Sequence, residues 1–211
     1  MALLYFSALA VGFSGAMMPG SLLTYTIRQS LTVGPKAGFI VIAGHAILEF
    51  LLIILIFLGF GSILQSSVAQ TAIGLIGGAF LLFMGVDMIT GAIRNTVKVK
   101  TDGSGVLTRN LVWSGLAISA ANPYFLLWWA IIGLGFIMKS YSAFGVLGVV
   151  LYYLGHISAD LIWYGFVSTV VGKTKQFIKE TPYRVIIAGL GGLLIFFGGS
   201  FLFSAIGKVV L

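Results

Sequence analysis

The sequence predicts an all-α integral membrane protein with six transmembrane helices. We expect these helices to form two inverted three-helix repeats, with helices 1 and 4 broken by proline. Three observations support the prediction: a strongly apolar composition, basic residues concentrated in alternate loops, and matching phrases in the two halves of the chain. Apolar residues make up 59% of the 211 residues, charged residues make up 8%, and the mean hydropathy is +1.12. Soluble domains carry a much larger share of charged residues.

Long apolar segments supply the six expected spans. They cover, to within a few residues, 3–27, 37–62, 71–93, 110–138, 143–171 and 184–207. Each is longer than the roughly 20 residues that cross a bilayer as a helix. The first segment lacks a basic leader, so we expect it to be retained as a span and not removed as a signal peptide.

The basic residues predict how the spans are oriented. Ten of the twelve lie in the first, third and fifth loops: Arg28, Lys36, Arg94, Lys98, Lys100, Arg109, Lys173, Lys175, Lys179 and Arg184. Cytoplasmic loops carry an excess of Lys and Arg, so we expect both termini outside the cell and the chain in the plasma (inner) membrane of a prokaryote. This topology explains the net charge of +7, and no nucleic-acid partner is expected.

Three phrases recur in the same order in the two halves. The matched pairs are AMMPGSLL with AANPYFLL (16–23 and 120–127), GHAILE with GHISAD (44–49 and 155–160), and GGAFLLFMG with GGLLIFFGG (77–85 and 191–199). We therefore divide the chain into a first repeat, a cytoplasmic linker and a second repeat, at residues 1–94, 95–109 and 110–211. Three spans are an odd number, so the second repeat enters the membrane in the opposite sense, as is typical of secondary transporters.

Four ionisable residues lie near the middle of expected spans. Each GH phrase places a carboxylate four residues after a histidine, so the pair His45 and Glu49 shares one helix face. The same spacing places His156 beside Asp160. Ionisable groups at this depth are costly and mark ion, proton or substrate pathways. We predict that both acids bind substrate and exchange the coupling proton, and that both histidines assist this transfer or orient the acids.

Proline interrupts one span in each half, at Pro19 and Pro123. An internal proline removes a backbone hydrogen bond and kinks or breaks the helix. The freed backbone groups and the N-terminus of the following half-helix suit a substrate carboxylate. The expected binding residues are Pro19, Gly20, Ser21, Asn122 and Pro123. A kink that serves only helix packing is the alternative interpretation.

Asp87 is the third acid within a span, and it has no counterpart in the second half. It lies six residues before Ile93, near the expected cytoplasmic end of its helix, where Arg28 and Arg94 are possible partners. An ion pair that gates the pathway and a purely structural ion pair are both compatible with this position.

Aromatic and sulfur-containing residues point to no further chemistry. Trp128, Trp129, Trp163 and Tyr164 are more typical of a lipid-facing aromatic belt than of a pathway lining. Cysteine is absent, which excludes thiol catalysis, disulfides and thiolate metal sites. No cofactor is expected.

Taken together, these residues resemble the LysE-type amino-acid exporters and their wider superfamily. The resemblance covers the whole chain and rests on the Pro-Gly break at 19–20, LTVGPKAGF at 31–39 and the Asn-Pro break at 122–123. Ser21 stands where the family pattern has the second proline of Pro-Gly-Pro, and Tyr124 replaces the lysine of Asn-Pro-Lys. The resemblance implies a six-span carrier that exports amino acids or metal ions. Because both departures fall at the expected site, it does not extend to a specificity for lysine, threonine or homoserine.

The predicted function is secondary export of amino acids or similar small zwitterions by alternating access, coupled to a proton or another cation. The alternative is a divalent metal-cation exporter whose ligands are His45, Glu49, His156 and Asp160. An intramembrane enzyme that uses these residues as acid and base is a third hypothesis. No Ser motif, thiol or HExxH accompanies them, so we expect no enzymatic activity. The sequence leaves open whether copies of the chain form a homo-oligomer.

Overall fold

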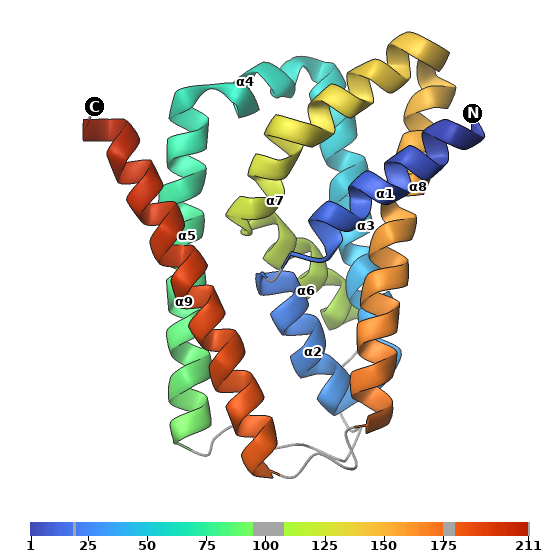
Figure 1. Cartoon of the computed structure of the whole chain (residues 1–211). Coiled ribbons are helices and arrows are strands. Elements are labelled where there is room, and N and C mark those ends of the chain that lie inside the picture. The colour runs from blue at the N-terminus through green and yellow to red at the C-terminus, as the bar shows by residue number, and fades with distance from the viewer. Residues whose placement is uncertain (19, 95–107, 175–179, 211) are drawn as a thin grey trace.

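The computed structural model describes residues 1–18, 20–94, 108–174 and 180–210, and every secondary-structure element in them is helical (Figure 1). The helices are α1 Ala2–Ala16, α2 Ser21–Val33, α3 Ala37–Leu55, α4 Gly61–Gln65, α5 Ser67–Ile93, α6 Thr108–Ala120, α7 Pro123–Trp128, α8 Leu134–Thr174 and α9 Glu180–Val210. π-Helical turns at Ile56–Phe60 and Trp129–Gly133 join α3 to α4 and α7 to α8. Pro19, most of the predicted linker, Lys175 and Lys179 lie outside the described residues. The prediction of an all-α protein is confirmed.

Four helical segments in the described part of the chain are long and apolar enough to cross a membrane. They are Ala37–Gln65, Ser67–Ile93, Pro123–Thr174 and Arg184–Gly207. The pair α1 and α2, bent by 80°, adds a fifth if the two helices form one span. These segments confirm an integral membrane protein, whereas the count of six spans stays a prediction.

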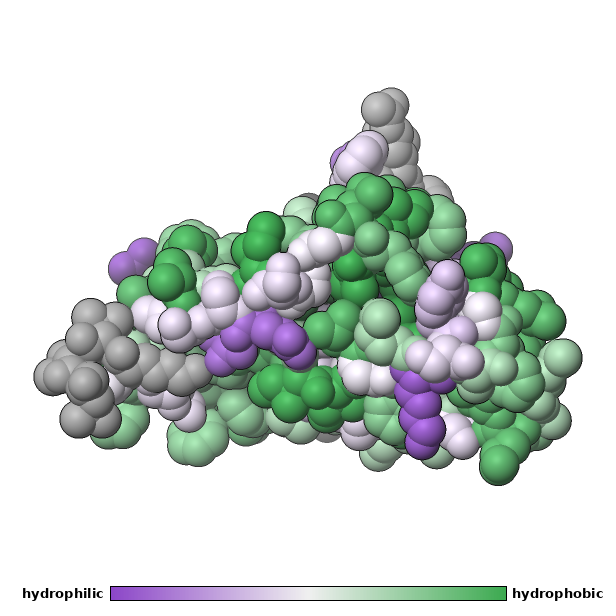
Figure 2. Space-filling model, turned by 90° about the horizontal axis from the view of Figure 1, so that it is seen from above, coloured by the Kyte–Doolittle hydropathy of each residue, from purple (hydrophilic) through white to green (hydrophobic). Residues whose placement is uncertain are grey.

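The surface of the molecule is largely apolar. Leu3, Ile76 and Phe203 are 81%, 74% and 83% exposed. Figure 2 shows that apolar side chains also cover much of the face seen from above, with hydrophilic side chains in isolated patches. Such a surface suits contact with lipid, because large exposed apolar areas are rare on soluble monomers.

Two backbone breaks divide the second half of the chain. The first separates α6 from α7, where the Asn122 side chain accepts a hydrogen bond from the Tyr124 amide at 3.1 Å and Pro123 begins the new helix. The second lies within α8 at Gly145, whose φ of +58° favours glycine. Figure 1 shows the chain turning back in this region of α8. The turn lies close to the predicted boundary between the fourth and fifth spans.

Glycines allow α5 and α9 to pack backbone against backbone, and their contacts are reciprocal. A Cβ added at Gly78 would lie 2.9 Å from the carbonyl oxygen of Gly198, and one at Gly198 would lie 2.8 Å from that of Gly78. Gly85 and Gly191 show the same relation, at 2.6 and 2.8 Å. The two helices form an antiparallel pair at one side of the molecule (Figure 1).

The other long helices make a second group, in which α1 packs on α8 and α3 packs on both α6 and α8. Gly44 of α3 lies against the backbone of Val112 in α6, and Gly115 of α6 lies against the backbone of Val41 in α3. Because small residues let helices approach closely, this packing holds α3 beside α6. Since α3 and α8 carry the two GH phrases, their contact brings the predicted site residues together.

Gly44→Ala is expected to destabilise the fold by about 3 kcal/mol, because its methyl group overlaps the Val112 carbonyl and forces α3 from α6. The matched control is Gly189→Ala in α9, where no atom lies within 4 Å of an added Cβ. Thermal unfolding in detergent measures both variants. Equal midpoints for the two variants would show that the α3–α6 contact is looser than the structure indicates.

Candidate functional site

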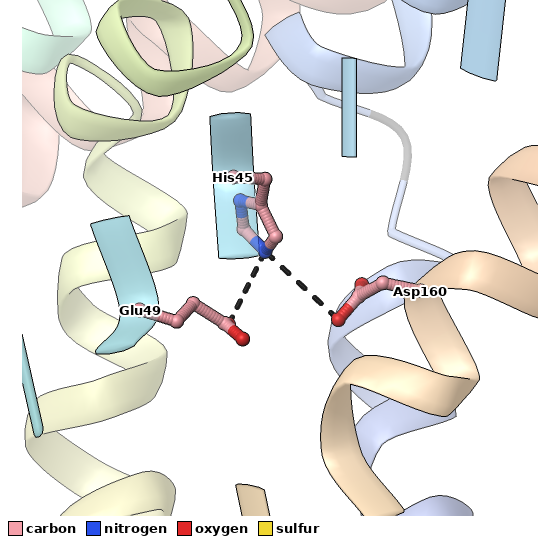
Figure 3. A group of neighbouring side chains, drawn as sticks. All are labelled: His45, Glu49 and Asp160. Carbon is pink, nitrogen blue, oxygen red and sulfur yellow. Dashed lines mark ion pairs between the residues drawn. The ribbon is translucent and has the colours of Figure 1, made fainter. Parts of the chain in front are cut away.

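The two GH phrases meet through the carboxylate of Glu49. Its Oε1 lies 3.2 Å from His45 Nε2 on the same helix and 3.0 Å from His156 Nε2 on α8. Asp160 Oδ2 lies 3.9 and 3.8 Å from the same two nitrogens. Figure 3 shows the His45 ring between the two acids. The structure therefore brings all four predicted residues into one cluster, which we call the His–acid cluster.

Two further residues hold this cluster in place. Trp129 donates from Nε1 to Glu49 Oε1 at 3.3 Å, and Ser119 Oγ lies 2.8 Å from His45 Nδ1. Both partners come from the second half of the chain, from α6 and from the π-helical turn after α7. Glu49 is consequently the more strongly held of the two acids, because three ring nitrogens lie within 3.3 Å of one of its oxygens.

Burial leaves some polar atoms of the His–acid cluster without partners among the described residues. All four side chains are at most 7% exposed. Glu49 Oε2, Asp160 Oδ2 and His156 Nδ1 are buried and accept or donate no hydrogen bond. Unpartnered buried acceptors are costly, so a ligand that donates hydrogen bonds or carries positive charge is favoured here. His45, Glu49 and Asp160 also offer one metal-ligand atom each, all within 4.8 Å of one another.

A cavity of about 50 Å³ lies beside the cluster. Its lining includes the four cluster residues together with Gly15, Gly20, Leu22, Ser119, Asn122, Tyr124, Phe125, Trp128, Trp129 and Tyr164. This space is large enough for at least one water molecule or one small polar group of a ligand. The cavity therefore places such a group beside the buried polar atoms of the cluster.

The broken helices contribute to this cavity unequally. Gly20 and Asn122 line it, whereas Ser21 is buried next to it and Pro123 packs its ring against Gly77 of α5. The Asn122 side chain caps the Tyr124 amide, so that donor is already satisfied. Pro19 lies outside the described residues. Substrate binding by Gly20 and Asn122 has a structural basis, and for the two prolines and Ser21 it stays a prediction.

The aromatic-belt interpretation is wrong for three of the four residues. Trp129, Tyr164 and Trp128 are 0%, 4% and 5% exposed and line the cavity. The Trp128 and His156 ring centroids lie 4.8 Å apart. Sequence reasoning also missed Ser119, which no motif marks, and Phe125, although it lies within the AANPYFLL phrase. The position of Ser119, three residues before Asn122 on the same span, is the one available signal.

Two of the three predicted gate residues, Arg28 and Asp87, lie together, and the described residues show no ion pair for any of the three. Arg28 of α2 and Asp87 of α5 line a second cavity, and the described ion pairs all belong to the His–acid cluster. Arg94 is exposed at the end of α5. Gating by these residues therefore stays a prediction.

Comparisons with known proteins agree with the resemblance seen in the sequence. The model of the LysE type translocator family matches residues 13–205. The chemotactic transduction protein ChpE of Pseudomonas aeruginosa is 24% identical over 196 residues, which cover 93% of this chain and 96% of that protein. No solved structure matches the chain.

Proposed function

The chain belongs to the LysE type translocator family, and we propose that it exports amino acids or similar small zwitterions by proton-coupled alternating access. Members of this family are transporters and not enzymes, so the hypothesis of an intramembrane enzyme is not supported. The family assignment supports movement of a small molecule across the membrane. The substrate class and the coupling ion rest on the site itself.

The observation that carries the proposal is the pairing of two buried acids with unpartnered oxygens inside an aromatic-lined cavity. Glu49 Oε2 and Asp160 Oδ2 are acceptors without donors, and an ammonium group supplies such donors. The rings of Trp128 and Trp129 add favourable contacts for a cation. Gly20, just before the N-terminus of α2, supports placing the substrate carboxylate at that end of the cavity.

Alternating access requires two parts that rock against each other around this cavity. Glu49 comes from the first proposed repeat and Asp160 from the second, so relative movement of the repeats opens or closes the site. The reciprocal glycine contacts between α5 and α9 support an inverted repeat.

We place the basic helix ends in the cytoplasm. In Figure 1 the C-terminal ends of α2, α5 and α8 lie opposite both termini. Arg94 follows α5, and Lys173 is in the last turn of α8. The positive-inside rule therefore supports termini on the outer side of a prokaryotic inner membrane.

The family match does not favour a divalent-cation exporter, although three ligand atoms of the His–acid cluster are close enough to bind an ion. Manganese is nevertheless the appropriate competing tracer, since two carboxylates and imidazoles suit that metal. Labelled manganese beside labelled amino acids distinguishes the two alternative functions in a single experiment.

Counterflow in proteoliposomes tests the proposed function. We expect a labelled amino acid from a panel to exchange against the same unlabelled amino acid, with no movement of labelled manganese. Protein-free liposomes and the lipid-facing variant Ile47→Ala, 47% exposed, are the controls. Manganese movement without amino-acid exchange would overturn the proposal.

A further inference from the structure

A second polar cavity lies between α2 and α5, apart from the His–acid cluster. It encloses about 60 Å³, and Thr24, Arg28, Met84, Asp87 and Met88 contribute to its lining. Arg28 and Asp87 are its charged residues. They carry opposite charges, and neither is used by the proposed transport chemistry at the centre of the molecule.

The two charges share this cavity without forming an ion pair in the described part of the chain. Both also lie inside their helices: Asp87 is six residues before Ile93, about 9 Å along the axis of α5. Arg28 is five residues before Val33 on α2. Both side chains are exposed, so a ligand has access to the two charges. Their separation therefore leaves room for a ligand that compensates both.

We propose that Arg28 and Asp87 form a binding site for a zwitterionic head group, with its anionic oxygens on Arg28 and its ammonium on Asp87. A guanidinium binds carboxylate or phosphate oxygens through two parallel hydrogen bonds, and a carboxylate accepts from an ammonium. Because both charged side chains are exposed, the rest of such a ligand can lie outside the cavity. Met84 and Met88, being flexible and apolar, can accommodate varied groups attached to it.

The position of this site suits the loading of a solute before transport. Arg28 follows Leu22, which lines the central cavity, by six residues on the same helix, about 9 Å. A free amino acid that binds here therefore lies close to the central cavity, on its proposed cytoplasmic side. This role rests on the proposed function, whereas binding of a zwitterion does not. An ethanolamine phospholipid carries the same pair of charges and is the other source of the head group.

A single cysteine reports on the site, because the chain contains none. Met84→Cys places a thiol in the cavity lining, and its rate of modification by a small neutral thiosulfonate reagent measures occupancy. In lipid-free detergent, glycine is expected to slow modification, whereas methylamine and acetate, with one charge each, are not. Tyr25→Cys is the second reporter if Met84→Cys reacts too slowly. Ser62→Cys in α4, which is exposed, is the control that glycine leaves unchanged.

Two substitutions assign the binding to the charged pair. Arg28→Gln and Asp87→Asn are each expected to raise the glycine concentration needed for protection about tenfold, the effect of losing one charged contact. Asp160→Asn, at the central site, is expected to leave protection unchanged. The proposal would be overturned if methylamine or acetate protected the reporter cysteine as well as glycine does. It would also be overturned if neither glycine nor lipid slowed the modification of either reporter cysteine.

Lipid nanodiscs separate the two sources of the head group. Protection in ethanolamine-lipid discs but not in choline-lipid discs identifies the lipid, because a quaternary ammonium cannot donate to Asp87. Protection by glycine in choline-lipid discs identifies the free solute. Glycine protection without counterflow would support this binding site and overturn the proposed transport function. Counterflow without any protection would support transport and overturn this binding site.

Discussion

Glu49→Ala is expected to abolish transport and to lower the stability of the folded protein. Glu49 Oε1 is the shared partner of His45, His156 and Trp129, at 3.2, 3.0 and 3.3 Å. Its removal leaves three buried ring nitrogens without this partner. The expected cost is about 3–5 kcal/mol, as for one partner lost from a buried ion pair. For a chain of this size that corresponds to a fall of about 10 °C in the unfolding midpoint.

Two control variants separate the structural role of Glu49 from its role in transport. Glu49→Gln keeps an acceptor oxygen in the same place, so most of the stability is expected to return while counterflow stays absent, because the charge that binds the ammonium is gone. Ile47→Ala on the same helix faces outward and is expected to leave both measurements near wild type. If Glu49→Ala kept wild-type stability and counterflow, the His–acid cluster would be neither the transport site nor important for the stability of the fold.

The His–acid cluster was predictable from the sequence because it follows from the spacing of residues on a helix and from the energetic cost of ionisable groups in a membrane. Residues four apart share a helix face, and ionisable groups within apolar spans need partners. These two arguments select His45, Glu49, His156 and Asp160, and the structure places them together. The break before Pro123 follows in the same way from the missing backbone donor of proline.

Features that depend on the packing of distant helices were not predictable. Ser119 and Trp129 contact the cluster only because α3 lies between α6 and α8. Tryptophan is amphipathic, so composition alone favoured a lipid-facing belt, whereas the indole N–H of Trp129 is satisfied by a buried carboxylate.

The register of the proposed repeats also depends on packing. The sequence match pairs Gly77 with Gly191. In the structure Gly78 contacts Gly198 and Gly85 contacts Gly191. If the repeats are related by a twofold axis, that axis exchanges these two contacts only when Gly78 corresponds to Gly191. Gly77 instead accommodates the ring of Pro123. A run of similar apolar residues aligns almost equally well one position away, and only the closest backbone contacts decide between the two registers.

Asp160→Asn is expected to retain amino-acid exchange and to lose accumulation driven by a pH gradient. Asp160 is held less firmly than Glu49, since its Oδ2 lies 3.9 and 3.8 Å from the two imidazoles and has no hydrogen-bond partner among the described residues. It can therefore gain and lose a proton without breaking the contacts that Glu49 makes. Asparagine has the same shape as a permanently protonated aspartate, so the site still closes around substrate but no proton leaves with each cycle.

The measurement compares counterflow with uptake under an imposed pH gradient in the same proteoliposomes. We expect counterflow within about twofold of wild type and gradient-driven accumulation lowered at least tenfold, a difference of about 1.4 kcal/mol or more in driving force. Ile162→Ala is the control, because it lies on the same helix as Asp160 but is 54% exposed and has no part in the proposed site. If Asp160→Asn still accumulates substrate as wild type does, the proton is carried elsewhere. Asp160 would then serve only to bind the ammonium, and Glu49 with its two imidazoles would be the remaining pathway for coupling.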